Sequence, residues 1–205
     1  ATLELRRVTL IIGPQASGKS VLCKLAHFFI DIPAIQTAAV HKGETYEKFS
    51  TRVKKAFTDW FPPAAWGQGK FKIEFSAGSY SASVSRSVYA DKIRDDCRIK
   101  FSAEFKKQYE ELLKQAKLSR ESTAEQGQIF FPLEYRTQEL VQKSMHSLMG
   151  RDAVDQQVFI PAGRSFFTSI GKAIAVFDQG KLLDPLILRF GRLYAATREN
   201  AQYYA

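Results

Sequence analysis

Residues 3–30 have the sequence LELRRVTLIIGPQASGKSVLCKLAHFFI, and this stretch decides the expected fold. Residues 3–12 end in a β-branched apolar run and predict a buried strand. Residues 19–30 carry apolar side chains at helical spacing and predict a helix. Between them, residues 13–20 match G-x-x-x-x-G-K-[ST], the pattern of a phosphate-binding loop that joins a strand to a helix. The sequence therefore predicts an α/β fold with a P-loop NTPase core.

The chemistry of such a loop explains its residue types. Gly13 and Gly18 permit backbone angles that let successive amide N–H groups surround a phosphate, aided by the positive end of the helix dipole. Lys19 would reach the β- and γ-phosphate oxygens as a catalytic residue, and the Ser20 hydroxyl would bind the metal. The expected ligands are therefore ATP and Mg²⁺. The residues predicted to bind the nucleotide are Gly13, Pro14, Gln15, Ala16, Ser17, Gly18, Lys19, Ser20 and Val21.

A nucleotide hydrolase also needs an acid at the end of an apolar strand to complete the magnesium shell. Only residues 174–178 have that form, ending in Asp178, with Gln179 where many ATPases carry Glu. The surrounding apolar residues favour an amphipathic helix instead, because they fall at helical spacing: Phe166, Phe167, Ile170, Ile174 and Phe177. Asp178 as the magnesium acid is therefore the less favoured interpretation.

Arg164 is the second catalytic candidate. It follows a short strand predicted at residues 158–161, and strand ends are where sheets of this kind bind their ligands. From that position Arg164 would approach the phosphate loop and stabilise charge there. A surface ion pair accounts for the residue equally well.

Composition and charge bound the class of protein. A chain of 205 residues with 45% hydrophobic content is long enough for one domain with a real core. Charged residues interrupt the long apolar runs and no secretory signal is evident, so we expect a cytoplasmic protein with no membrane span. The net charge of +9 favours a polyanionic partner, and nucleic acid stays open beside the nucleotide. The two cysteines and three histidines show no zinc-ligand spacing.

The rest of the chain predicts attachments to this core. Residues 44–60 predict an amphipathic helix, and residues 70–89 alternate between apolar and polar side chains as a β-hairpin subdomain. Residues 91–149 predict a helical insertion, with 119–128 as its mobile loop. Residues 182–203 contain a further helix. The first half of the insertion contains one apolar stripe at helical spacing: Phe101, Phe105, Tyr109, Leu112 and Ala116.

Two further groups of residues have ordinary interpretations. Glutamates dilute the lysines of the insertion, which favours a solvated helix face over a contact with DNA. Those lysines are Lys106, Lys107, Lys114 and Lys117. Cys23 lies in the helix predicted after the phosphate loop and is expected to be buried there.

Three stretches resemble the ABC-type ATPase heads of the SMC, RecF and OLD-like group, some of which serve in antiphage defence. Residues 3–29 resemble the first strand, phosphate loop and helix of such heads. Residues 71–86, FKIEFSAGSYSASVSR, resemble their antiparallel subdomain, and residues 158–165, VFIPAGRS, are similar to a "yiPAeRs" stretch of OLD-like ATPases. The resemblance implies an ATP-hydrolysing module that acts as a nucleotide-gated switch, with a homo-oligomer or an effector protein as partner.

The chain departs from that pattern, because it shows no serine-rich signature motif, acid-bearing strand with a catalytic Glu or switch histidine. Residues 1–205 are therefore expected to be a single ATPase-type domain or its N-terminal lobe, with part of the catalytic site outside this chain. Two other functions stay open. A small-molecule or nucleotide kinase would close an arginine-bearing lid, for which Arg151, Arg164, Arg189 and Arg192 are available. A nucleotide-binding structural subunit would need no catalytic acid.

Overall fold

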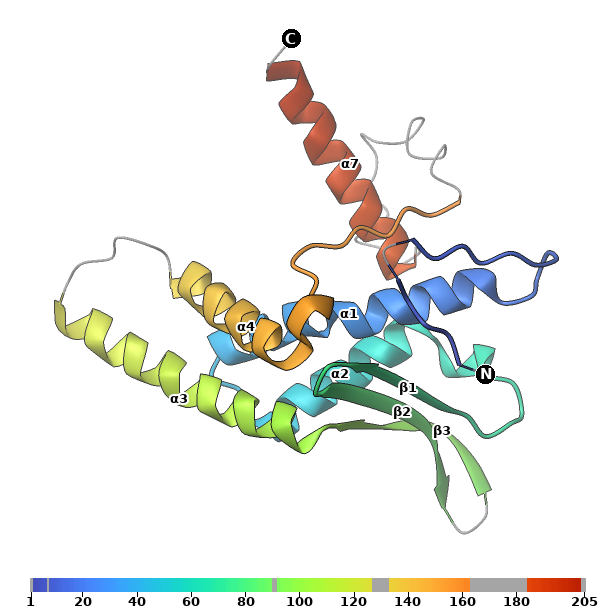
Figure 1. Cartoon of the computed structure of the whole chain (residues 1–205), viewed down its shortest axis with the longest axis horizontal. Helices are drawn as coiled ribbons and strands as arrows, with labels where there is room; N and C mark the ends of the chain where they lie inside the picture. The colour runs from blue at the N-terminus through green and yellow to red at the C-terminus, as the bar shows by residue number, and fades with distance from the viewer. Residues whose placement is uncertain (1, 7, 90–91, 127–132, 163–183, 204–205) are drawn as a thin grey trace.

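The computed structural model describes residues 2–6, 8–89, 92–126, 133–162 and 184–203 as a mixed α/β arrangement (Figure 1). The helices are α1 (Lys19–His41), α2 (Tyr46–Trp60), α3 (Ala103–Gln126), α4 (Leu133–Met149) and α7 (Pro185–Tyr203), with single 3-10 turns at η1 (Pro63–Ala65) and η2 (Gly150–Asp152). The strands are β1 (Lys72–Ala77), β2 (Tyr80–Tyr89) and β3 (Lys92–Phe101). The predicted α/β class is confirmed at this level, and the described strands pair only in antiparallel fashion.

The three strands form one sheet in the order β1–β2–β3. β1 and β2 make the hairpin predicted for residues 70–89. β3 then pairs with β2 from Phe101, opposite Ala82, to Lys92, opposite Tyr89. The prediction that the insertion is helical from residue 91 is therefore wrong for residues 92–101, because their backbone groups pair with β2 instead.

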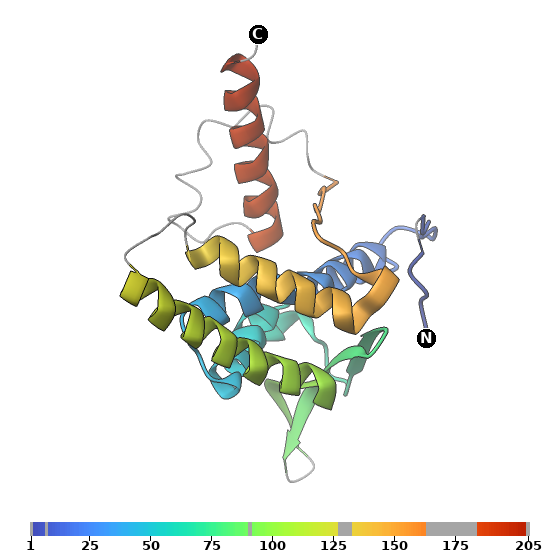
Figure 2. The ribbon, with the colours of Figure 1, turned by 60° about the vertical axis from the view of Figure 1, so that its left-hand side comes forward.

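α2, α3 and α4 contact this sheet, whereas α7 projects away from it in both views (Figures 1 and 2). α1 packs against α2 and α4, while α3 packs against α4 and against β2. α2 lies on the sheet beside β3, as the alternation of apolar and charged residues along it requires. The helix predicted for residues 44–60 is confirmed as α2, which begins after Thr45, whose hydroxyl accepts a hydrogen bond from the backbone N–H of Lys48 at 3.5 Å.

Aromatic side chains fill the space between the helices and the sheet. The ring of Phe49 on α2 stacks on Tyr109 of α3, with centroids 4.7 Å apart, and Phe101 of β3 stacks on Phe105 of α3 at 4.8 Å. Four members of the predicted stripe are buried on α3: Phe105, Tyr109, Leu112 and Ala116. The fifth, Phe101, reaches the same core from β3. The stripe therefore marks a buried face, as predicted, although a strand and a helix share it.

α3 continues further than the sequence suggested. Residues 119–128 were expected to form a mobile loop because they lack large apolar side chains, yet α3 extends to Gln126. Five of the eight residues from 119 to 126 are Arg, Glu, Ala or Gln, which have high intrinsic helix propensity and favour continuation of the helix. The loop prediction is therefore wrong up to residue 126, and residues 127–128 lie outside the described part of the chain.

Two segments predicted as buried strands form neither strand nor helix. In the segment before the phosphate loop, Val8, Leu10 and Ile12 are 86%, 79% and 83% exposed. In the second segment, Val158 and Ile160 are also largely exposed. A strand needs a neighbour to take up its backbone hydrogen bonds, and within the described residues no strand pairs with either segment. Both strand predictions are wrong for this structure.

α1 is the one helix, among those the structure describes, that is long and apolar enough to cross a membrane by length and composition. Core helices of packed domains meet the same test. Within the described structure Phe28, Ile32 and Val40 of α1 are fully buried against other elements. The absence of a membrane span, expected from the charges that interrupt the apolar runs, stays a prediction.

The turn between β1 and β2 provides a test of this packing. Gly78 has a φ of +57°, and a Cβ atom there would lie 2.4 Å from the carbonyl oxygen of Leu148 on α4. Gly78→Ala should therefore lower the free energy of unfolding by about 2 kcal/mol or more, since both the backbone angle and the contact oppose the new methyl group. Chemical denaturation measures the change.

Gly67→Ala is the matched control for this substitution. Gly67 has a similar φ of +67°, but a Cβ atom at this position meets nothing within 4 Å. The control should therefore show the cost of the backbone angle alone, about 1 kcal/mol. Equal destabilisation by the two variants would contradict the close approach of α4 to the hairpin turn.

Candidate functional site: the phosphate loop

Residues 13–20, the candidate phosphate loop, contain two residues with left-handed backbone angles, a feature of turns that bind anions through main-chain N–H groups. Gly18 immediately precedes α1 in the left-handed region, with φ +85° and ψ +7°. Ala16 also has a positive φ, +60°, and is the one non-glycine residue with this property in the described part of the chain. Alternation between right- and left-handed residues turns successive N–H groups toward a common point, which makes an anion-binding concavity.

Gly13 contributes in a different way from the one its pattern suggested. Its φ is not positive, so the backbone angle at this position does not require glycine. A Cβ atom on Gly13 would lie 3.1 Å from the hydroxyl oxygen of Ser17 and 4.0 Å from a side-chain carbon of Lys19. The missing side chain therefore allows the two ends of the loop to approach each other.

Lys19 holds the loop together from the first turn of α1. Its ammonium group donates to the carbonyl oxygen of Gly13 at 2.7 Å, to the hydroxyl oxygen of Ser17 at 3.2 Å and to the carbonyl oxygen of Pro14. No carboxylate lies within ion-pair distance of Lys19 among the described residues. The positive charge is therefore solvated by neutral oxygens and is available to an anion.

The loop is open to solvent at the start of α1, far from α3 in both views (Figures 1 and 2). Every residue from 12 to 18 is exposed, as are Ser20 and Val21. The backbone N–H groups of Gly18, Lys19 and Ser20 find no acceptor in the described part of the chain. The residues predicted to bind nucleotide are thus brought together around unpaired donors.

Other predicted residues lie elsewhere. Arg164 and Asp178 fall outside the described residues, so the structure places neither of them. Cys23 is exposed on the first turns of α1, which makes the prediction of a buried cysteine wrong. This part of α1 lacks the sheet that would cover it, and Leu22 beside it is 42% exposed.

The donor set for a metal is partial. The Ser20 hydroxyl is in the first turn of α1 and is exposed, so it can ligate a cation that arrives with nucleotide phosphates. The described residues contain no group of three or more His, Cys, Asp or Glu side chains that could hold a metal on its own. The structure is therefore compatible with Mg²⁺ carried in by a nucleotide and shows no separate metal centre within the described ranges.

Further along α1, three residues spaced three and four positions apart contact the later part of the chain, two through their side chains and one through its backbone carbonyl group. Lys24 forms an ion pair with Asp184, and Asp31 forms one with Arg189 of α7 at 2.6 Å. Gln157 donates to the carbonyl oxygen of His27 at 3.0 Å. The sequence carried a signal for this cluster, since Lys24, His27 and Asp31 interrupt an apolar helix on one face.

His27 lies at the centre of that cluster. Its side chain is 6% exposed and stacks on Trp60 with ring centroids 5.7 Å apart. Its Nε2 atom is buried and has no hydrogen-bond partner within the described structure. Burial lowers the pKa of the His27 imidazole below its ordinary value of 6.5, while the nearby Asp31 carboxylate opposes that change and Arg189 reinforces it.

A hollow of about 290 Å³ lies between α1 and α4, well removed along α1 from the phosphate loop. Its polar side chains satisfy one another: Asp155 accepts from Gln142 at 2.7 Å and lies 2.5 Å from Nε2 of His146. The remaining lining is mostly apolar, including Ile30, Val141 and Met145. No described side chain offers this hollow a free charge, so the phosphate loop remains the candidate site.

Comparisons of the chain with protein-family models, with curated proteins and with solved structures gave no match in any of the three. The assignment of a function therefore depends on the geometry of the loop and on the chemistry of its residues.

His27→Phe tests the burial of the neutral imidazole. A folded-state pKa below that of the unfolded chain means that the unfolded chain binds a proton first, so stability is retained above about pH 6.5 and falls as the pH drops below it. The variant should lose less stability than the parent between about pH 7.5 and about pH 5.5. Urea denaturation at the two pH values measures this, and equal losses would exclude His27 as a source of the acid sensitivity.

Proposed function

We propose that the loop of residues 13–20 binds the phosphates of ATP together with Mg²⁺, and that the chain is the nucleotide-binding part of an ATPase. The observation that carries the proposal is the Lys19 ammonium, held inside the loop by neutral oxygens alone. Ala16 and Gly18 add the left-handed angles that orient main-chain donors. An anion entering the loop meets both the cation and the unpaired N–H groups.

Binding would exchange one set of Lys19 partners for another. In the structure the ammonium group bridges the carbonyl oxygens of Gly13 and Pro14. Phosphate oxygens carry a full negative charge, and charge-assisted hydrogen bonds are about twice as strong as those to neutral carbonyls. A triphosphate would therefore draw Lys19 to its β- and γ-phosphate oxygens, while the Ser20 hydroxyl ligates the metal that accompanies them.

The proposed mode of action is a nucleotide-gated switch, as the resemblance to SMC, RecF and OLD-like heads implies. Exposed apolar side chains support an assembly partner, since Val8, Leu10 and Ile12 directly precede the loop and are largely in solvent. A second copy of the chain or an effector protein would cover them. Roles in antiphage defence or DNA transactions, and a cytoplasmic location, belong to this proposal.

A kinase with an arginine lid has less support. The Arg189 guanidinium is already paired with Asp31 on α1, so it is not a free cation above the phosphate loop. Arg164, a residue of the expected lid, lies outside the described residues. No contact in the described structure favours a kinase over an ATPase.

Lys19→Ala tests nucleotide binding. ATP with Mg²⁺ at 100 times its Kd should stabilise the parent protein by about 2.7 kcal/mol, because it binds the folded state alone. For a domain of this size that energy raises Tm by about 5–10 °C. Lys19→Ala should abolish the rise in a thermal-shift measurement without lowering the Tm of the free protein greatly, since the side chain is tied to the loop and not to the core.

Lys42→Ala is the matched control, because it removes one exposed lysine at the opposite end of α1. This variant should keep the full nucleotide-dependent rise in Tm. If Lys19→Ala and the parent shifted equally, the phosphate loop would not be the nucleotide site.

Turnover is expected to be weak in the 205-residue chain. Hydrolysis needs a positioned acid or base to orient the attacking water, and in the described structure no carboxylate lies beside Lys19. The chain should therefore bind ATP but release phosphate at a rate little above background in a steady-state phosphate assay. Multiple turnovers that disappear in Asp178→Asn would refute this expectation and identify Asp178 as the magnesium acid.

A further inference from the structure

The ends of β2 and β3 extend beyond the body of the molecule as a two-stranded ribbon, visible from both directions (Figures 1 and 2). Four basic residues of β3 are exposed. Lys92 and Arg94 lie on this projecting part, whereas Arg98 and Lys100 lie where β1 makes the sheet three-stranded. Within the described residues none of the four forms an ion pair. β3 therefore presents uncompensated positive charge along an edge strand whose end projects.

The acidic residues of the sheet do not neutralise these cations, because each is paired with another basic residue. Asp95 pairs with Arg86 at 2.7 Å, and Asp96 pairs with Lys54 of α2 at 2.7 Å. On β1, Glu74 pairs with Lys72 at 2.6 Å. The unpaired charges on the strands are therefore all positive.

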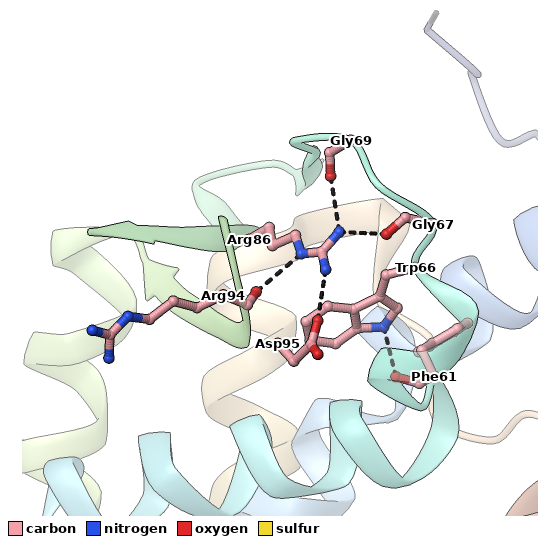
Figure 3. A network of polar contacts seen from close by, with 7 residues as sticks. All are labelled: Phe61, Trp66, Gly67, Gly69, Arg86, Arg94 and Asp95. Carbon is pink, nitrogen blue, oxygen red and sulfur yellow. Dashed lines mark hydrogen bonds and ion pairs between the residues drawn. The ribbon is translucent and has the colours of Figure 1, made fainter. Parts of the chain in front are cut away.

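Arg86 also fixes the shape of the ribbon, as Figure 3 shows. Its side chain is 6% exposed and donates to the carbonyl oxygens of Arg94 at 3.0 Å and of Gly67 at 2.7 Å, across the face of Trp66. Through these bonds, Arg86 on β2 holds two other segments. One is the connection that precedes β1, and the other is the irregular part of β3, which lies between two stretches of regular pairing. Because Arg86 fixes the backbone of the ribbon, the basic side chains of β3 lose little conformational entropy when they bind an extended anion.

The projecting end carries an aromatic platform as well as charge. Tyr89 is 68% exposed, and the guanidinium of Arg94 lies 4.8 Å from the centre of its ring. Val88 and Ile93, which face each other across the ribbon, are 40% and 37% exposed. Exposed aromatic and β-branched side chains at the end of a basic ribbon suit contact with base edges and sugars rather than with water alone.

The spacing and the neighbours of the basic residues suit a phosphate backbone. Arg98 and Lys100 are two residues apart on one strand, so they share a face at a separation of about 7 Å. Their partners on β2 are small: Arg98 is opposite Ser85 and Lys100 is opposite Ser83. Nothing bulky on β2 therefore blocks a phosphate chain from reaching the two cations.

From these observations we propose that the β2–β3 ribbon binds duplex DNA. Tyr89 and Arg94 contact the major groove, and Arg98 with Lys100, further along β3, binds phosphates of the backbone. The major groove is about 12 Å wide and admits a two-stranded β-ribbon. This surface is separate from the phosphate loop, so the proposal stands whether or not the loop binds ATP.

The experiment compares two charge-matched double variants of the full chain. Arg98→Gln with Lys100→Gln removes two ribbon cations, and Lys106→Gln with Lys107→Gln removes two exposed cations from α3. Binding of a fluorescent duplex of about 20 base pairs is followed by anisotropy at several salt concentrations. The ribbon variant should bind about tenfold or more weakly at low salt, with a salt slope smaller by about 2. The α3 variant should bind as the parent does.

Three results would overturn the proposal. They are no binding of the duplex by the parent, equal loss of affinity in the two double variants, and equally effective competition by poly-glutamate at the same charge concentration, which would indicate an acidic protein as the partner.

Tyr89→Ala should also weaken binding while leaving the salt slope unchanged, because it removes a contact that is not ionic. Thermal unfolding of each variant shows that the fold is retained, as expected for substitutions of exposed side chains.

Discussion

The aromatic contact between Phe49 and Tyr109 holds together segments that are far apart in the sequence. Phe49 belongs to α2 and Tyr109 to α3, and both rings are fully buried. Phe101 joins the same cluster from β3, so helix, sheet and helix meet at one place. α1 packs on α2 through edge-to-face contacts of Phe28 with Phe57. The direction of α1, and hence of the phosphate loop at its start, depends on this chain of aromatic contacts.

Local patterns predicted those parts of the fold whose period is unbroken. The helix at residues 44–60 and the hairpin at residues 70–89 were found because each has one buried face. β3 was missed because Asp95 and Asp96 interrupt its alternation and make the stretch resemble a solvated helix. Their charges are satisfied by Arg86 and Lys54, which lie on other elements. Such tertiary pairing has no local signature in the sequence.

In the candidate site, too, local features were predicted from the sequence and long-range contacts were not. The spacing of Gly18 and Lys19 predicted a loop before a helix, and the structure gives Gly18 the left-handed angle expected of it. The attachment of α7 was not predicted, because the ion pair of Asp31 with Arg189 joins residues 158 positions apart. The strand predicted before the loop failed for another reason. Its side chains are apolar, but strand formation depends on a neighbour that the described residues do not contain.

An edge strand carries lysine and arginine in many proteins merely to prevent pairing with another sheet, and that function needs charge alone. The ribbon has more than charge. An arginine buried to all but 6% braces it, and that bracing does nothing to deter edge pairing. Tyr89, Val88 and Ile93 also leave apolar surface at its end, which protection from aggregation would disfavour. Rigidity, unpaired cations and an exposed aromatic ring together are what a ligand-binding ribbon requires, and protection of the edge explains only the second of them.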